Sequence, residues 1–265
     1  MKIMITAGGT TEKIDPVRGI TNTATGTLGS LTAEEFVKQG GGRIEKIFYV
    51  CGKGSVVPAL ERMDVFMAEG AEDVQDILSD LLTAHTIDAV VHSMAVSDYC
   101  VESITTVESL SGWIANRIFH DKRDGFQSEG ALAGYIAACM NENDRLLDNS
   151  QKIGSAIDDL ILTMKRTPKL ISLVKSLQPS AVLVGFKLLN GVERRQLLDA
   201  GYDLLRKNHC DMVLANDLRD IGGERHVGRL IFPDRSHVRF ESKKEIAHGI
   251  VRNVLSLIDK EVCQP

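Results

Sequence analysis

Short, almost wholly apolar runs recur along the chain and alternate with longer segments in which apolar residues return every three or four positions. The apolar runs predict buried strands at 2–6, 44–51, 89–92, 181–186 and 211–215. The periodic segments predict helices at 28–39, 71–84, 168–177 and 192–208. Buried strands that alternate with helices are typical of a parallel sheet covered on both faces. The pattern therefore predicts an α/β fold with a Rossmann-like, mostly parallel sheet and helices on both faces.

Two parts of the chain depart from this rhythm. Near the C-terminus, apolar segments at 229–232 and 237–240 flank a polar turn, which predicts a hairpin, and a helix follows at 243–260 with Ser242 as its cap. Residues 101–150 are polar and mixed, with a helical stretch only at 131–140. We expect one domain over 1–265 in which 101–150 form an insertion or flap: a lid, a dimer contact or a disordered loop.

Composition narrows the class of protein. A chain of 265 residues is long enough for one well-buried α/β domain. Its net charge of -5 argues against non-specific nucleic-acid binding, which needs a dominant basic face. The start lacks the pattern of a signal peptide, and no apolar run approaches the roughly 18–20 residues of a membrane span. We therefore expect a cytoplasmic protein with neither a nucleic acid nor a membrane as its partner.

The cysteines are scattered and odd in number, and none forms a C-x-x-C pair. This pattern indicates reduced, mostly structural thiols rather than a disulfide framework or a zinc site. The cysteines are Cys51, Cys100, Cys139, Cys210 and Cys263.

A glycine turn follows the first predicted strand. Glycines after a parallel strand let the backbone turn tightly, so that main-chain N–H groups at Gly8, Gly9 and Thr10 can face a phosphate. A tight turn without a ligand fits the same residues. The turn is not a G-x-G-x-x-G fingerprint, which counts against an ordinary NAD site.

Polar residues then gather before the first predicted helix. Asp15-Pro16 disfavours a helical backbone, so we expect Arg18 and Asn22 to lie on a loop. The free N–H groups of the helix predicted from residue 28 form a second anion site. An Arg and an Asn in this setting suit a ligand with a phosphate and a polar acyl group. A solvated Arg18 and a turn role for Asn22 remain open.

Two more candidates follow the third predicted strand. Asp98 comes after small residues that leave room for a ligand, and its carboxylate can accept hydrogen bonds from a base or a sugar. A capping role without a ligand fits Asp98 as well. Lys152 lies beside small residues and can neutralise a carboxylate or phosphate, although most lysines are simply solvated.

Eight short motifs occur along the chain in one order. They are ITAGGT at 5–10, DPVR at 15–18, NTATG at 22–26, AVSDY at 95–99, KI at 152–153, TPK at 167–169, GFKL at 185–188, and KN at 207–208 followed by ANDL at 215–218. The series resembles phosphopantothenoylcysteine synthetase, most closely its stand-alone bacterial form. The resemblance covers nearly the whole chain apart from about 101–150.

The resemblance implies a two-step ligation in coenzyme A biosynthesis. The carboxylate of 4′-phosphopantothenate attacks the α-phosphate of a nucleoside triphosphate, and pyrophosphate leaves. The amine of cysteine then displaces the nucleoside monophosphate and forms the amide. The family uses Mg²⁺ with the triphosphate and is usually homodimeric.

The resemblance also implies roles for individual residues. Asn22 matches the residue that holds the acyl-nucleotide, Lys152 a lysine at the reacting centre, and Arg18 and Ala95 positions on the pantothenate side. The residues that match the nucleotide site are Gly8, Gly9, Thr10, Asp98, Lys152, Lys165, Arg166, Thr167, Pro168, Phe186 and Lys207. The motifs do not identify metal ligands.

The identity of the nucleotide and two other functions stay open. Many relatives carry Ser-Ser-Gly-Lys where this chain has residues 24–27, and a nucleotide-contacting lysine of fused enzymes falls near Asp203. Bacterial relatives use CTP, whereas Lys187 after Phe186 resembles the ATP-using eukaryotic branch, so CTP is favoured and ATP stays open. The alternatives are an NADP-dependent Rossmann-type oxidoreductase, for which Lys53 could bind the extra phosphate, and a non-catalytic nucleotide-binding module.

Overall fold

The computed structural model describes residues 1–122, 125–222 and 225–262, and the chain divides into two compact units. The first unit consists of Met1–Thr11, Thr21–Asp98 and the chain from Pro168 onward. The second unit consists of Glu12–Ile20 and Tyr99–Thr167. It is therefore longer than the insertion predicted at 101–150, and it also takes a piece from near the N-terminus.

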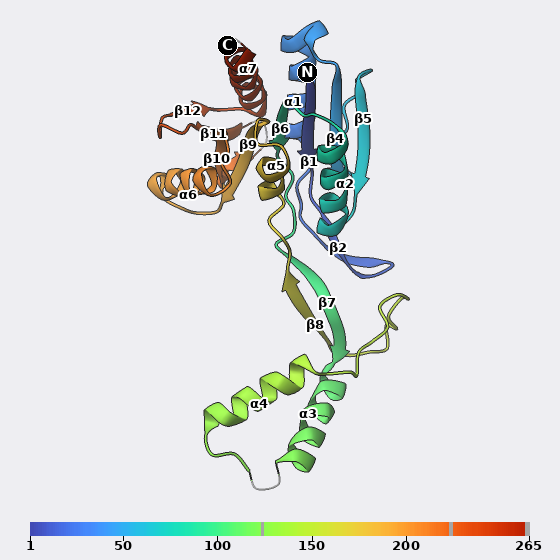
Figure 1. The fold of residues 1–265 in the computed structure, drawn as a ribbon. Coiled ribbons are helices and arrows are strands. Elements are labelled where there is room, and N and C mark those ends of the chain that lie inside the picture. Colours follow the sequence, from blue (N-terminus) through green and yellow to red (C-terminus); the bar gives the residue numbers. More distant parts are fainter. Residues whose placement is uncertain (123–124, 223–224, 263–265) are drawn as a thin grey trace. The chain divides into compact units, whose positions relative to one another are not determined.

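An eight-stranded sheet forms the centre of the first unit (Figure 1). Its order is β12-β11-β10-β9-β6-β1-β4-β5, with parallel pairing from β5 to β10 and antiparallel pairing of β11 and β12. The strands are β1 Lys2–Ala7, β4 Lys46–Gly52, β5 Met63–Ala68, β6 Ala89–His92, β9 Val182–Leu189, β10 Met212–Gly222, β11 Arg225–Ile231 and β12 His237–Phe240. The chain proceeds from β1 to β4 and β5 on one side, and to β6, β9 and β10 on the other. The strand order therefore reverses between β1 and β6, and in open α/β sheets such a reversal marks the ligand-binding edge.

Alternating side chains of the strands build a core on each face of this sheet. On β1, Ile3 and Ile5 pack in the same cluster as residues of α1 (Thr27–Gly40) and α7 (Lys243–Val262). Met4 points the other way, into a cluster with residues of α2 (Ala71–Ala84), α5 (Ile171–Leu177) and α6 (Arg194–Lys207). This alternation follows from the two-residue period of a strand. The predicted Rossmann-like sheet with helices on both faces, a C-terminal hairpin and a final helix is confirmed.

The second unit combines a two-stranded ribbon with two helices. Strands β7 (Tyr99–Thr106) and β8 (Leu160–Arg166) pair antiparallel, and α3 (Val107–Asp121) and α4 (Glu129–Asn141) lie between them in the chain. The indole of Trp113 on α3 donates a hydrogen bond of 2.8 Å to the carbonyl of Cys139 on α4. The sequence predicts only α4 of these four elements. A two-stranded ribbon leaves much of each strand exposed, so β7 and β8 lack the apolar run of a buried strand.

Several local expectations are wrong. The first strand leads into a small two-stranded sheet of β2 (Thr11–Asp15) and β3 (Arg18–Thr21), not directly toward a helix, so Arg18 begins a strand instead of lying on a loop. Helix α5 begins at Ile171, three residues later than the predicted start at 168. Strand β5 lies at the edge of the sheet and carries an exposed Asp64, so its sequence is not a continuous apolar run and the pattern does not predict it. A short 3₁₀ turn at Gly41–Arg43 follows α1.

The cysteines that the structure describes are free thiols. These are Cys51, Cys100, Cys139 and Cys210, whereas Cys263 lies outside the described residues. None of the helices in the described ranges combines the length and the apolar character needed to cross a membrane.

Candidate functional site

The loops that follow β1 and β6 are hydrogen-bonded to each other at the point where the strand order reverses. Gly9 and Ala95 form a parallel bridge; the Ala95 N–H donates to the Gly8 carbonyl at 2.8 Å, and the Thr10 N–H donates to the Ala95 carbonyl at 3.2 Å. This contact places the predicted glycine turn beside the predicted substrate position, Ala95. The carboxyl edge of the sheet is thus the centre of the candidate site.

The two glycines of this turn are required by the packing of neighbouring chain segments. Gly8 has a φ of +78°, and a Cβ built on it would lie 1.8 Å from the Ser55 hydroxyl oxygen. A Cβ on Gly9 would lie 2.1 Å from the Asn22 carbonyl oxygen. The turn is therefore closed by the segments around Ser55 and Asn22, which explains both glycines without a ligand. A phosphate role for its main-chain N–H groups stays a prediction.

Asn22 uses its amide nitrogen to hold the loop after β6. Nδ2 donates to the Ala95 carbonyl at 2.9 Å and lies 3.4 Å from the Ser97 hydroxyl oxygen. Thr10 supports the same loop, because its hydroxyl accepts a 2.8 Å hydrogen bond from the Ser97 N–H. The structure thus brings Thr10, Asn22 and Ala95 together. The amide nitrogen of Asn22 is used by these hydrogen bonds, so its amide oxygen is the atom that can accept a hydrogen bond from a ligand.

A cavity of about 160 Å³ lies at the carboxyl edge of β6 and β9. Three residues predicted for the nucleotide site line it together: Asp98, Pro168 and Phe186. The other lining residues are His92, Met94, Val96, Ser97, Lys169, Leu170, Ile171 and Leu204. Its volume is close to that of cavities of about 150 Å³ that accept benzene. The cavity therefore suits one aromatic ring of a ligand, such as a base, and not a whole nucleotide.

Asp98 already has a partner in this cavity. Its carboxylate forms an ion pair with the Lys169 ammonium, and both side chains are exposed. Exposed ion pairs contribute little to stability, so a ligand can displace Lys169 from Asp98 at small cost. Lys169 belongs to the TPK motif, but the sequence alone predicts no role for it. Its position directly after Pro168 is the feature of the sequence that places it at the site.

His92 is a second residue of the cavity to which sequence reasoning gives no role. It ends the buried strand β6, and its Nδ1 lies 3.0 Å from the Thr6 hydroxyl oxygen. Burial lowers the pKa of the His92 imidazole to about 4. At neutral pH, His92 therefore presents an uncharged ring to the cavity. A polar residue at the end of an apolar strand was the signal in the sequence.

In the second unit, a buried carboxylate organises the turn between β2 and β3. The Asp15 side chain is fully buried and accepts hydrogen bonds from the backbone N–H groups of Val17 and Arg18, each at 2.9 Å, and of Ile153 at 3.2 Å. Arg18 donates from Nε to Asp15 at 2.9 Å and from Nη2 to the Ile153 carbonyl at 2.8 Å. The hydrogen bond from Arg18 holds the pKa of the Asp15 carboxyl well below its usual range.

The hydrogen bonds of Arg18 engage it within the protein and locate Lys152 beside the segment that Arg18 holds. Two guanidinium nitrogens of Arg18 are engaged by the protein, so within the described chain only Nη1 lacks a protein acceptor. Lys152 directly precedes Ile153, is exposed, and has no ion-pair partner among the residues that the structure describes. Arg18 therefore acts on the segment that carries Lys152, and its capacity for a bidentate contact with a substrate is reduced.

Lys165, Arg166 and Thr167 lie where the second unit ends. Lys165 and Arg166 close strand β8, where they pair with Cys100 and Tyr99, and both are exposed. Thr167 is the last residue of the second unit, and Pro168 begins the next segment of the first. Lys165 and Arg166 thus end a strand, and Thr167 begins the irregular segment that follows it.

Lys207 is not brought to the carboxyl edge of the sheet. Helix α6 begins after the carboxyl end of β9 and ends before the amino end of β10. Because β9 and β10 are parallel, the two ends of α6 lie at opposite edges of the sheet. Lys207 occupies the last turn of α6, at the edge away from Gly8 and Asp98.

Within the described ranges, no group of three His, Cys, Asp or Glu side chains is placed to hold a metal ion.

Comparisons with known proteins agree with the fold and with the family resemblance. The family model of the DNA/pantothenate metabolism flavoprotein C-terminal domain matches residues 1–108 and 136–258. The coenzyme A biosynthesis bifunctional protein CoaBC of Thermococcus kodakarensis is 28% identical over 232 residues, which cover 86% of this chain and 45% of that protein. The chain thus spans about half the length of the curated relatives that it matches.

Solved structures match over nearly the whole chain. The DNA/pantothenate metabolism flavoprotein from Streptococcus pneumoniae aligns with a TM-score of 0.76 at 28% identity, covering 97% of this chain and 99% of that one. A Cab2 variant in complex with phosphopantothenate-cysteine aligns with a TM-score of 0.64 at 18% identity, covering 98% of this chain and 87% of that one. At this identity, the second match shows the shared fold alone.

Proposed function

Since the chain belongs to the family of the DNA/pantothenate metabolism flavoprotein C-terminal domain, we propose that it is a phosphopantothenate–cysteine ligase of coenzyme A biosynthesis. The observation that carries the proposal is the convergence of Asn22, the loop after β6 and the cavity of Asp98 and Phe186 at the reversal of the strand order. The relatives that are named for coenzyme A biosynthesis support the choice of pathway, and the Cab2 complex is an example of a protein with this fold that binds phosphopantothenate-cysteine.

In the proposed reaction, a carboxylate oxygen of 4′-phosphopantothenate attacks the α-phosphorus of the triphosphate, and pyrophosphate leaves. The amine nitrogen of cysteine then attacks the acyl carbon. The nucleoside monophosphate leaves, and the amine loses a proton as the amide forms. The first step brings a carboxylate to a polyanion and so needs cationic groups, whereas the second step needs above all the correct position of the neutral amine.

The residues of the first unit suit the nucleotide. We assign the base to the cavity, against the Phe186 ring and the uncharged His92, with Asp98 accepting a hydrogen bond from an amino group. An exocyclic amino group occurs in both CTP and ATP, and the small cavity favours the single ring of CTP. The Asn22 amide oxygen is assigned to the acyl-nucleotide, which a neutral amide can hold without attacking it.

In the second unit, the exposed Lys152 is assigned to the developing negative charge, as a cation that forms no ion pair with the residues that the structure describes. Mg²⁺ enters this proposal as the complex of the nucleotide, that is, as part of the substrate. We further propose a cytoplasmic homodimer, in line with the family resemblance.

A pyrophosphate-release assay tests the proposal. The protein is given 4′-phosphopantothenate and Mg²⁺ with CTP or ATP, and then cysteine. We expect release that depends on phosphopantothenate, is faster with CTP, and becomes catalytic when cysteine is added. An absence of release with both nucleotides contradicts the proposal. A parallel titration that shows tight binding of NADPH would favour the oxidoreductase instead.

A further inference from the structure

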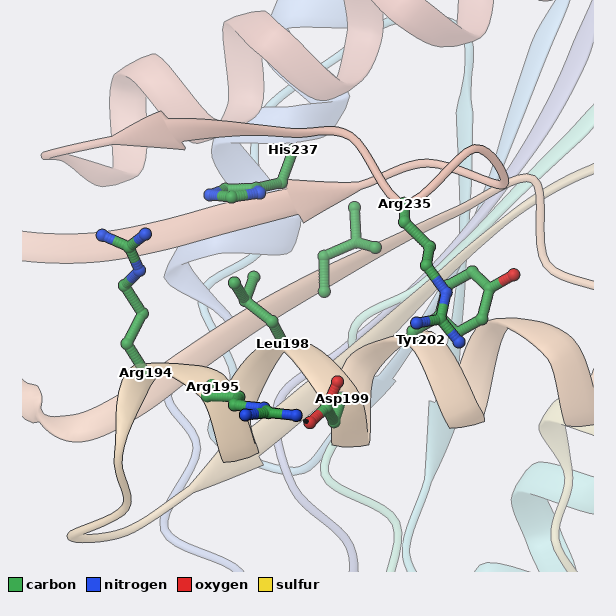
Figure 2. Close-up of a pocket in the computed structure, with 8 residues that line it drawn as sticks. Arg194, Arg195, Leu198, Asp199, Tyr202, Arg235 and His237 are labelled. Atoms are coloured by element: carbon green, nitrogen blue, oxygen red, sulfur yellow. Dashed lines mark ion pairs between the residues drawn. The ribbon is translucent and has the colours of Figure 1, made fainter.

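A second cavity, of about 350 Å³, shares no residue with the cavity at β6 and β9. It lies between helix α6, the end of β11 and the hairpin that leads to β12 (Figure 2). Its lining residues are Arg194, Arg195, Leu198, Asp199, Tyr202, Ile231, Arg235 and His237. None of them has a role in the proposed ligase reaction.

Two arginines of this cavity form no ion pair with any residue that the structure describes. Arg195 pairs with Asp199 at 3.8 Å, but neither Arg194 nor Arg235 has a carboxylate partner among the described residues. Other arginines of the chain do form ion pairs, such as Arg43, Arg117, Arg219, Arg225 and Arg239. In a chain with a net charge of -5, two unpaired guanidinium groups at one cavity indicate an anionic ligand.

These cations occupy positions that local structure disfavours. Arg194 and Arg195 stand in the first turn of α6, directly after the acidic N-cap Glu193, at the helix end where the dipole disfavours positive charge. Arg235 has a φ of +67°, in the left-handed region that favours glycine. Residues that the local backbone conformation or helix dipole disfavours are often kept because they serve a function.

Arg194 and Arg235 lie at two ends of the cavity, and Leu198 and Ile231 lie between them together with the Arg195–Asp199 ion pair. Figure 2 shows Arg194 extending toward the side where His237 lies, and Arg235 over Tyr202 at the other end. The Arg235 guanidinium lies 4.3 Å from the centre of the Tyr202 ring and so covers that face of it. Arg194 and Tyr202 are separated along α6 by eight residues, or about 12 Å. Leu198 and Ile231 supply the apolar floor.

We propose that this cavity binds a small aliphatic ligand with an anionic group at each end, at least one of them a phosphate. Guanidinium groups match phosphate and carboxylate oxygens in shape and charge. The Glu193 side chain caps the first turn of α6, so the guanidinium groups supply the donors at the end where Arg194 lies. Because Arg235 already covers the Tyr202 ring, the middle of the ligand is aliphatic and not aromatic.

A calorimetric titration with 6-phosphonohexanoate tests this inference, with hexylphosphonate and hexanoate as single-ended probes. We expect the double-ended probe to bind at least tenfold more tightly than either single-ended one. Arg194→Ala and Arg235→Gly should each weaken it at least tenfold, whereas Arg206→Ala, which removes the same charge from the other end of α6, should not. Arg235→Gly suits the backbone, so its Tm should equal or exceed that of the wild type.

Three outcomes would overturn the inference. The double-ended probe could bind no better than the single-ended ones, Arg206→Ala could weaken binding as much as the cavity variants do, or binding could be lost in Phe186→Leu instead. The last result would place the probe in the cavity at β6 and β9. Because no step of this test uses the ligation reaction, its outcome is independent of the proposed function.

Discussion

Arg18 holds the buried carboxylate of Asp15 with two guanidinium nitrogens, Nε at 2.9 Å and Nη2 at 2.5 Å. The same Nη2 also donates to the Ile153 carbonyl, and Asp15 accepts from the Ile153 N–H. The backbone beside Lys152 is thereby fixed to the turn between β2 and β3. Arg18, expected from the sequence as a substrate ligand, is in this structure first of all a positioning residue.

Replacing Asp15 with Asn removes the charge while it keeps the shape. We expect a lower Tm than that of the wild type at neutral pH, because the Arg18 guanidinium loses its buried partner. A carboxyl with a lowered pKa stabilises the fold above its unfolded pKa of about 3.9 and loses this effect as the pH falls toward the folded value. The difference in Tm between wild type and variant should therefore shrink below about pH 4.

Thermal unfolding followed by circular dichroism between acidic and neutral pH measures this difference. The matched control is Asp144→Asn, an exposed position in the same unit, which should leave the Tm unchanged. A Tm of Asp15→Asn equal to that of the wild type at neutral pH would contradict the role of the buried ion pair.

Lys152→Ala should lower kcat by about 100-fold or more, because a cation that offsets developing charge acts mainly in the transition state. The KM for phosphopantothenate should change far less. The rate of pyrophosphate release measures both quantities, and Lys244→Ala, at an exposed position on α7, serves as the control. Losses of equal size in kcat and in substrate affinity would instead point to simple binding.

Asn22→Asp should lower kcat/KM by about 100-fold or more, since it places a negative charge beside an anionic adduct. A carboxylate also cannot donate to the Ala95 carbonyl, so a moderate decrease in Tm is expected. Asn149→Asp adds the same charge at an exposed position and should be silent. An unchanged kcat/KM in Asn22→Asp would remove Asn22 from the site.

Phe186→Leu tests the assignment of the cavity to the base. Leucine preserves much of the packing of Phe186 against the core but loses the aromatic face, so the nucleotide KM should rise about tenfold. The KM values for cysteine and phosphopantothenate should stay constant. Phe119→Ala, on an exposed side chain of α3, is the control. A nucleotide KM that does not move would place the base elsewhere.

His92 also predicts that the fold loses stability as the pH falls, because burial disfavours the charged form of its imidazole, whereas Asp15 is stabilised in its charged form by Arg18. Its pKa is about 4 in the fold and 6.5 when unperturbed, so the unfolded state takes up the proton first as the pH falls. Stability should decrease from pH 6.5 down to about 4 by at most about 1.4 kcal/mol per pH unit. In His92→Gln this slope should become shallower, because burial also lowers the pKa of His226 and leaves a remainder, whereas His120→Gln should retain the full slope. Chemical denaturation at several pH values distinguishes the two.

The elements predicted correctly share one cause. Strands β1, β6 and β9 are buried on both faces, so each reads as a continuous apolar run wherever it lies in the sheet. Strands β5 and β7 are an edge strand and half of a ribbon, and their exposed sides carry polar residues that hide the pattern. Burial, more than intrinsic propensity, decides which strands a sequence reveals.

The candidate site divides in the same way. Asp98 and Phe186 follow or end predicted strands, so the rule for the carboxyl edge brings them together. The partners of Arg18 and of Gly8 lie far away in the chain, at Ile153 and Ser55, and no local pattern reports such contacts. Lys207 shows the reverse case, because a matching motif does not indicate which end of α6 faces the site.

The central sheet also has a consequence for synthesis on the ribosome. Strands β6 and β9 are hydrogen-bonded neighbours, with Ala89 opposite Val182, yet all of Tyr99–Thr167 is made between them. While that segment emerges, β6 is the last strand of the nascent sheet. Its free edge has unpaired backbone hydrogen-bonding groups, and its side chains are apolar on both faces of the sheet. Vectorial folding therefore leaves this chain with a long interval in which chaperones have a defined strand edge to protect.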